Sequence, residues 1–378
     1  MTKREELLAA IRHEEGVVPS WTMAFFNIDL AIKLLGQENV MTDFLAGESY
    51  PIGRADDDNR LRNIRYSVAV DNYAIAMGKG GNFAFGHGGP GEMMERVIES
   101  GENHYISVYE TGVKKLVKKN PHFSHSYDHP LETLENVESL EMPDAADQSR
   151  YEGLDDDARY YKEHGYLPYA NLNGIFSGVH YFFYPYDKLF MDMILEKENL
   201  KILIKKLAHF NLTAAENLLR RGAEMITTCD DLGDGRSMLF SPELYEELFM
   251  PYHAELAALC HSYGALLHLH SHGNIMSVMP MLVETGIDVI NPFDPYEIGD
   301  LSEIKERFGK KITIAGGMNK FFFSYSKDEM RAFLSKTIDI GRKGGGFIFM
   351  DNGGIPEDVS EDTYNYYREI SRELRAAR

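Results

Sequence analysis

Short apolar segments recur along the chain, and helix signals separate them. Ser241 followed by Pro242 is typical of a helix start, and Gly264 is typical of a helix end. The expected strands cover residues 17–21, 73–77, 167–173, 224–229, 266–270, 287–290, 312–315 and 346–350. Because helices between successive strands are what a parallel sheet requires, the pattern predicts an α/β protein with a (β/α)₈ TIM-barrel fold.

The segment from about residue 86 to residue 128 interrupts this alternation. Residues 86–90, Gly-His-Gly-Gly-Pro, are typical of a loop. Residues 105–109 and 113–117 predict a β-hairpin that turns at Thr111-Gly112. We interpret the segment as an insertion after the second strand that rises above the barrel. Residues 1–378 are therefore expected to form a single TIM-barrel domain.

Charge and cysteine content limit the possible partners and location. The chain has 59 acidic and 39 basic residues, a formal net charge of −20, and only two cysteines. So acidic a surface repels phosphate backbones and anionic lipid, so nucleic acid and membrane are not expected partners. The N-terminus is too charged for a signal peptide, and proline and glycine interrupt the least charged stretch, residues 163–187. We therefore expect a soluble, cytoplasmic protein.

Three alternating histidines end the fifth expected strand, in the segment from His268 to Asn274. Alternate residues of a strand share a face, so His270 and His272 can converge on one metal ion. His268 lies deeper in the strand, and we interpret it as a supporting core histidine. In a barrel, reactive groups cluster at the C-terminal ends of the strands. His270 and His272 are therefore the predicted metal ligands.

Carboxylates follow two other expected strands. Asp230 and Asp231 come directly after residues 224–229, and adjacent side chains of an extended segment point in different directions, so one of the two is expected to face the pocket. We predict a catalytic role for this pair, as hydrogen-bond acceptor or general base. Asp351 follows the eighth strand and is the predicted third metal ligand, although a turn role is an alternative. Cys229 could supply a thiolate, but packing is the favoured interpretation of a free cysteine.

Substrate contacts are expected from residues at the same ends of the strands. Trp21 and Phe25 lie at the end of the first strand and just beyond it, in a segment that leaves the barrel towards the pocket. Asn173 ends the third strand and Asn291 follows the sixth. These four residues are the predicted substrate-binding set.

Several segments together resemble the uroporphyrinogen decarboxylase-like superfamily, over nearly the whole chain. The C-terminal part of the resemblance is carried by the histidine–glycine segment and by the strand after it. The matching segments are Leu7–Glu14 with Val18–Trp21, Asp230–Gly233, Phe240–Glu243 with Pro251, Gly264–Asn274 and Gly286–Pro292. The resemblance implies a TIM barrel and one of two activities, decarboxylation of a porphyrinogen or corrinoid-linked methyl transfer.

The residues after the first strand separate these two branches. The decarboxylases use arginines there to bind a substrate with many carboxylates. This chain has Met23-Ala24-Phe25-Phe26-Asn27 instead, with no arginine between Arg12 and Arg54. An apolar mouth on an acidic protein pairs poorly with a polyanion. The resemblance is therefore closer to the methyltransferase branch, and a carboxy-lyase acting on a tetrapyrrole or another carboxylate remains the alternative.

The methyltransferase branch implies a cofactor, a partner and a set of ligands. Its members bind zinc through a His-x-Cys pair and a later cysteine, and they exchange a methyl group with the methylcobalamin of a corrinoid protein. His270 matches the family histidine, His272 stands in place of the first cysteine, and the second cysteine falls at about Gly353. Asp351, Asn352 and the Asp230–Asp231 pair are the candidate replacements. With imidazole and carboxylate in place of thiolate ligands, the ion is expected to be harder than in the family members. A thiol, an oxygen compound or an amine is therefore a possible small-molecule substrate.

Overall fold

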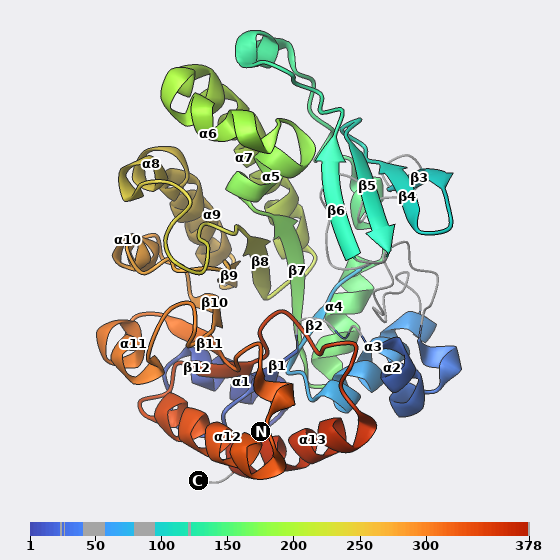
Figure 1. The fold of residues 1–378 in the computed structure, drawn as a ribbon, viewed down its shortest axis with the longest axis vertical. Helices are drawn as coiled ribbons and strands as arrows, with labels where there is room; N and C mark the ends of the chain where they lie inside the picture. Colours follow the sequence, from blue (N-terminus) through green and yellow to red (C-terminus); the bar gives the residue numbers. More distant parts are fainter. Residues whose placement is uncertain (23–24, 26, 41–56, 79–94, 120–121, 377–378) are drawn as a thin grey trace.

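The computed structural model describes residues 1–22, 25, 27–40, 57–78, 95–119 and 122–376, and its architecture is the expected barrel (Figure 1). Eight strands pair in parallel in the order β1-β12-β11-β10-β9-β8-β7-β2, with helices around them. The strands are β1 (Ser20–Trp21), β2 (Ala74–Ala76), β7 (Leu167–Asn173), β8 (Met225–Cys229), β9 (Leu266–His270), β10 (Val289–Phe293), β11 (Thr313–Gly317) and β12 (Phe347–Met350). The predicted (β/α)₈ fold is confirmed, and the observed strand ends differ from the predicted ones by at most three residues.

A side chain replaces backbone pairing where the barrel closes. Among the described residues no ladder joins β1 to β2. Asn72, two residues before β2, accepts a 2.7 Å hydrogen bond from the backbone N–H of Thr22 and donates to the Thr22 carbonyl. Ser20 also donates to the carbonyl of Asp71. These bonds hold the two terminal strands of the sheet side by side.

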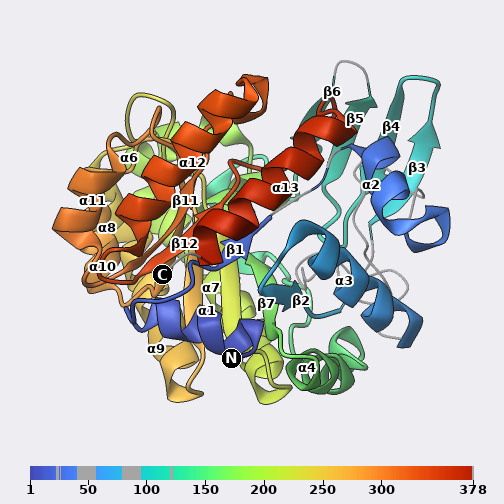
Figure 2. The same ribbon diagram turned by 90° about the horizontal axis from the view of Figure 1, so that it is seen from below.

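Capping residues mark the starts of several helices. α1 begins with a capping box of Thr2 and Glu5, and the helix expected after Ser241 is broken at Phe249, just before Pro251. Figure 2 shows α12 and α13 side by side along one side of the barrel. The helices are α1 (Lys3–Ile11), α2 (Ile28–Leu35), α3 (Asp57–Val70), α4 (Leu154–Glu163), α5 (Ile175–Phe182), α6 (Tyr186–Leu195), α7 (Lys197–Arg220), α8 (Pro242–Leu248), α9 (Met250–Ser262), α10 (Met279–Glu284), α11 (Leu301–Phe308), α12 (Lys327–Arg342) and α13 (Glu361–Ala376).

The insertion contains more strand than expected. The predicted hairpin is present as β4 (His104–Val108) and β5 (Lys114–Lys119), and its turn carries Gly112 at φ +89°. β3 (Arg96–Ser100) and β6 (His122–Tyr127) extend it to a four-stranded antiparallel sheet. Residues 86–90, the expected loop, lie outside the described residues. The sequence of β6, HFSHSY, has few β-branched residues, and for this reason the pattern did not predict it.

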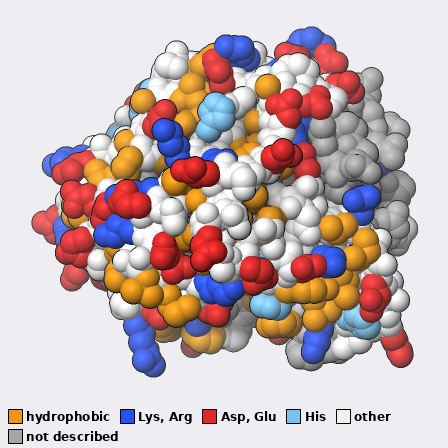
Figure 3. Space-filling view, turned by 90° about the horizontal axis from the view of Figure 1, so that it is seen from above, with side chains coloured by type: hydrophobic (Ala, Val, Ile, Leu, Met, Phe, Trp, Pro, Cys, Tyr) orange, Lys and Arg blue, Asp and Glu red, His pale blue; other side chains and the backbone are white. Residues whose placement is uncertain are grey.

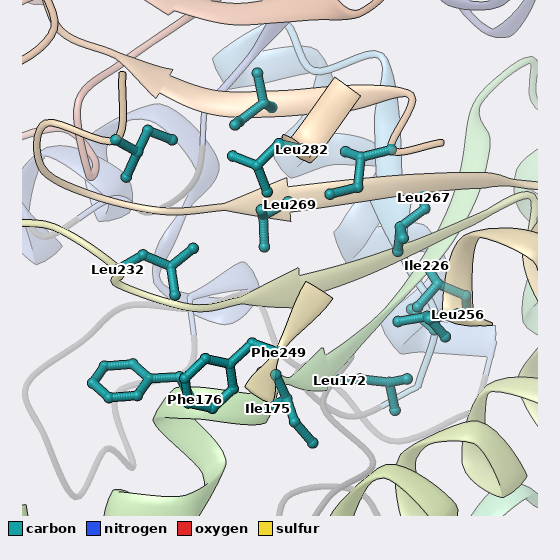
Figure 4. Packing of buried hydrophobic residues seen from close by; sticks show 14 of the residues in the cluster. Leu172, Ile175, Phe176, Ile226, Leu232, Phe249, Leu256, Leu267, Leu269 and Leu282 are labelled. Atoms are coloured by element: carbon teal, nitrogen blue, oxygen red, sulfur yellow. The ribbon is translucent and has the colours of Figure 1, made fainter. Parts of the chain in front are cut away.

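Strand alternation places the core and the site on opposite sides of the sheet. Figure 4 shows Leu267 and Leu269 of β9 in the layer between strands and helices, with Leu256 and Leu282 of the helices in the same cluster. The alternate residue His268 is buried inside the barrel, where its ring lies 5.0 Å from that of Trp21. Because side chains alternate along a strand, His270 continues the inner row at the strand end.

The exterior of the molecule is rich in charge. Figure 3 shows acidic side chains scattered over the face seen from above, interspersed with basic ones. No helix in the described part of the chain is long and apolar enough to cross a membrane.

A charge cluster near the N-terminal helix gives a stability prediction. Although burial raises the pKa of Asp71, the charges of Arg375 and Lys3 outweigh it and lower that pKa to about 2. Lys3 Nζ lies 2.8 Å from Asp71 Oδ1, and Arg375 donates to Oδ2. Asp71 has φ +61°, which asparagine tolerates. Asp71→Asn is therefore expected to lower the free energy of unfolding at pH 7 by roughly 2–3 kcal/mol.

The pH dependence of that loss follows from its sign. A lowered folded-state pKa stabilises the protein above the unfolded pKa of about 3.9, and the stabilisation is lost as pH falls towards 2. Urea unfolding at several pH values is therefore expected to show parent and Asp71→Asn converging below about pH 4. Asp156→Asn, which removes an exposed partner of Arg159, is the matched control and is expected to leave stability unchanged. A constant difference between parent and Asp71→Asn down to pH 2 would contradict this assignment.

Candidate active site

Three side chains with metal-binding atoms meet where β8 and β9 end. The two strands pair in parallel with Cys229 opposite His270, and Asp231 follows shortly after Cys229. One ligand atom from each of Cys229, Asp231 and His270 lies within 4.8 Å of the other two. His270 Nε2 is 3.7 Å from Asp231 Oδ1. Within the described ranges this is the one group of three such residues close enough to hold a metal ion, and it lies at the C-terminal ends of the strands.

The protonation states of this group follow from burial. Burial lowers the pKa of His270 to about 4, and the neighbouring His272 acts in the same direction while Asp231 opposes it. The imidazole is therefore neutral at pH 7 and has a free lone pair for a metal ion. Burial also raises the pKa of the Cys229 thiol well above its usual value, and the carboxylates of Asp231 and Asp230 raise it further. A cation at this position would have to displace the thiol proton.

The two adjacent aspartates point in different directions and have different surroundings. The carboxylate of Asp230 is buried and accepts hydrogen bonds from the backbone N–H groups of Ile175 and Ser177, at 2.9 and 2.8 Å. His253 Nε2 lies 3.1 Å from the same carboxylate. Asp230 thus caps α5 and fixes the end of β8. Asp231 is the carboxylate that reaches the three-residue group, and it also accepts a 2.9 Å hydrogen bond from the backbone of His272.

His272 lies beside the group of three without being part of it. Its ring centroid is 4.8 Å from that of His270, and its Nδ1 is 3.7 Å from Glu297 Oε2. A Cβ atom built on Gly353 would lie 3.8 Å from His272 Nε2. Gly353 is the position at which the resemblance places the second family cysteine. His272 therefore stands between His270 and the loop after β12 and is the candidate fourth ligand.

Of the other predicted site residues, Asn291 and Asn173 lie on strands that adjoin the three-residue group, and Asp351 lies at the end of a more distant strand. Asn291 pairs with His270 across β9 and β10. Burial lowers the pKa of both His268 and His270, and the Asn291 side chain partly opposes this effect. Asn173 is opposite Cys229 on β7. Asp351 is buried at the end of β12 and is not a member of the three-residue group. Burial raises the pKa of Tyr367 on α13, and the charge of Asp351 raises it further.

Two predicted substrate-binding residues are core residues. Trp21 is buried in the barrel, between the rings of Tyr169 and His268 at 4.9 and 5.0 Å. Phe25 is 1% exposed, and its ring packs edge-on against Tyr364 at 5.2 Å. Met23, Ala24 and Phe26, the rest of the expected apolar mouth, lie outside the described residues.

Sequence reasoning missed the helix that begins beside this group. Ser177 of α5 donates a hydrogen bond to the carbonyl of Cys229. Asp231 is among the charges that act on the pKa values of His180, Tyr181 and Tyr186. The available signal was a histidine and several tyrosines in an uncharged segment directly after a barrel strand. That position is at the active end of a barrel, but aromatic side chains are more often part of a hydrophobic core.

Comparison with known proteins agrees with this architecture. The family model described as Uroporphyrinogen decarboxylase (URO-D) matches residues 117–374. Among curated proteins no sequence match was found. A solved structure of a methyltransferase from Methanosarcina mazei is similar over 99% of both chains, with 13% identity and a TM-score of 0.69. A D-psicose 3-epimerase from Clostridium cellulolyticum H10, solved with D-tagatose, has 10% identity, a TM-score of 0.38 and coverage of 59% of this chain and 83% of its own.

The methyltransferase structure shares the whole fold, and at its low identity it shows the fold alone. The epimerase likeness is too weak to carry an argument. The family model, by contrast, spans well over half of the chain and includes β7 to β12 with both aspartates and the histidine segment. The chain therefore belongs to the uroporphyrinogen decarboxylase family, as the resemblance of its motifs predicted.

Proposed function

We propose that this protein is a metal-dependent methyltransferase that moves a methyl group between a corrinoid protein and a small thiol, oxygen or amine compound. The group of Cys229, Asp231 and His270 carries the proposal, because one sulfur, one oxygen and one nitrogen donor lie within 4.8 Å of one another. The fold shared with a solved methyltransferase supports it. The proposed location is the cytoplasm, whose reducing conditions suit two free cysteines.

The donor set fits a divalent ion such as zinc. Zinc binds thiolate, imidazole and carboxylate at about 2.0–2.3 Å, so its tetrahedral ligand atoms are about 3.5 Å apart. The 3.7 Å between His270 Nε2 and Asp231 Oδ1 is close to this value. The wider separations within the group, up to 4.8 Å, require side-chain adjustments of about 1 Å. Three protein ligands leave a position for substrate, or for His272.

Each residue has a proposed role in the reaction. Cys229, Asp231 and His270 would hold the ion, and a bound ion would lower the pKa of a thiol or polarise an oxygen or nitrogen substituent. In the transfer, the atom that releases the methyl group keeps the electron pair of the broken bond, and the accepting atom supplies the pair for the new one. When a thiol is the acceptor, its proton leaves to His272, whose side chain is 35% exposed. Asp230 positions the end of β8.

Metal analysis combined with a methyl-transfer assay tests the proposal. The purified protein is expected to contain about one zinc ion per chain. It is also expected either to transfer the methyl group of methylcobalamin to a thiol, or to form methylcobalamin from a methylated oxygen or amine donor. Removal of the metal with a chelator is expected to abolish the transfer, and added zinc is expected to restore it. Full activity of the metal-free protein, or no transfer with any of the three substrate classes, would contradict the proposal.

A carboxy-lyase acting on a tetrapyrrole is the second candidate, favoured by the description of the family model. Two acidic side chains lie at the site: Asp231 belongs to the metal group and Glu297 adjoins His272. Such a site repels a substrate with many carboxylates. Incubation with uroporphyrinogen is expected to leave the carboxyl groups of its acetate side chains in place. Release of these groups as CO2, with methyl groups left on the ring, would favour the lyase.

A further inference from the structure

Aromatic side chains of α5 and α6 form a continuous cluster beside the metal group. The ring centroids of His180 and Tyr181 are 4.2 Å apart, and those of His180 and Tyr186 are 4.9 Å apart. Phe190 lies 4.9 Å from Tyr186, and Phe176 lies 5.1 Å from His180. Tyr181 and Tyr186 are 47% and 46% exposed, so the cluster has a buried base and an open aromatic face. We call these five residues the aromatic cluster.

The attachment of α5 sets the position of this cluster. The backbone N–H groups of Ile175 and Ser177 donate to Asp230, and the Ser177 hydroxyl donates to the carbonyl of Cys229. His180 and Tyr181 are three and four residues after Ser177, so they lie on the same face of the helix one turn further along. That face is the one anchored at the end of β8. The aromatic cluster therefore lies next to the residues that hold the metal.

The charges around the cluster are negative. The acidic groups that act on the pKa values of His180, Tyr181 and Tyr186 include Asp231 and Asp234, and no lysine or arginine of the described chain is among the charges that act on them. Burial lowers the pKa of His180 to about 4, so its ring is uncharged at pH 7. Burial raises the pKa of Tyr181 to about 12, so its phenol stays protonated. Aromatic faces and carboxylates are thus the groups that a ligand meets here.

We propose that the aromatic cluster binds the ammonium group of a methylated amine, so that the small-molecule substrate is a cation. This inference rests on the proposed methyltransferase function and narrows its three substrate classes to one. Aromatic rings attract a quaternary or protonated ammonium through their faces, and nearby carboxylates add to the attraction. A thiolate or an acid would be repelled by the same surroundings. A divalent ion held by one thiolate, one carboxylate and one neutral imidazole has a net charge of zero with its ligands, so a bound metal would not repel the cation.

Calorimetric titration with a matched pair of probes tests this proposal. Choline and 3,3-dimethylbutan-1-ol have the same shape, and only choline carries the positive charge. The zinc-loaded protein is expected to bind choline at least about tenfold more tightly than the neutral alcohol. Tyr181→Leu is expected to weaken choline binding by about tenfold, and Tyr181→Phe to retain it, because phenylalanine keeps the aromatic face.

A second variant and a second assay make each outcome decisive. Tyr263→Leu removes a tyrosine of similar exposure, 42%, that follows α9 and precedes β9, and it is expected to leave choline binding unchanged. Equal binding of choline and the alcohol, or equal loss in Tyr181→Leu and Tyr263→Leu, would overturn the proposal. If methylcobalamin still methylates a thiol in that case, the methyltransferase function stands without it. If the protein binds choline selectively but transfers no methyl group, the result would support the cation site and contradict the proposed methyltransferase function.

Discussion

Replacement of His270 by alanine is expected to reduce zinc affinity on the order of 10³-fold and to abolish methyl transfer with it. His270 supplies the one nitrogen donor in the group with Cys229 and Asp231, and its neutral ring needs no proton loss to bind a cation. Without it, the group retains only the sulfur and oxygen donors of Cys229 and Asp231, and a site that loses one of its donors holds zinc more weakly. Competition with a chromophoric chelator measures the affinity, and the methylcobalamin assay measures the transfer.

His164→Ala is the matched control for this variant. His164 follows α4, where its Nδ1 contacts the carbonyl of Tyr160 and its ring is exposed. Its removal is expected to leave zinc affinity and methyl transfer at the parent values. His270→Ala protein that retains zinc with parent affinity would show that the group of three does not bind the metal.

The fold was predictable because its signals are local. Each buried strand is a short apolar run, and Ser241 followed by Pro242 marks a helix start that the structure confirms. Predicted and observed β7 and β9 coincide at both ends. The sheet of the insertion was only partly predicted, because the outer strands β3 and β6 consist largely of polar and charged residues and resemble loop sequence.

The composition of the candidate site depends on strand order, which local patterns do not contain. Asp351 follows β12, three strands from β9 in the sheet, whereas Cys229 and Asp231 follow β8, the direct neighbour of β9. Successive strands of a parallel barrel are neighbours, so the predicted topology already favours Cys229 and Asp231 over Asp351 as partners of His270. The sequence favours a packing role for Cys229, because most free cysteines are buried in packed cores. Its register opposite His270 is visible only in the assembled sheet.

Replacement of Asp230 by alanine is expected to lower the free energy of unfolding by about 3–5 kcal/mol. The carboxylate is fully buried, accepts the first backbone N–H groups of α5 from Ile175 and Ser177, and is paired with His253. Alanine would leave those donors without an acceptor in a site that water does not reach, and α5 would lose the negative charge at its N-terminus. Urea unfolding followed by circular dichroism measures the loss.

The neighbouring variant Asp231→Ala separates a structural effect from a metal-binding one. The Asp231 side chain is 44% exposed, so its removal is expected to leave unfolding nearly unchanged while zinc affinity falls. Gly174→Ala should resemble Asp230→Ala, because a Cβ atom there would lie 2.0 Å from Asp230 Oδ1 and 2.1 Å from the Cys229 carbonyl. Equal destabilisation by the two aspartate variants would contradict the division of roles. Two adjacent carboxylates with separate effects on stability and metal affinity would instead show that the anchoring of α5 and the binding of the ion are independent functions of one strand end.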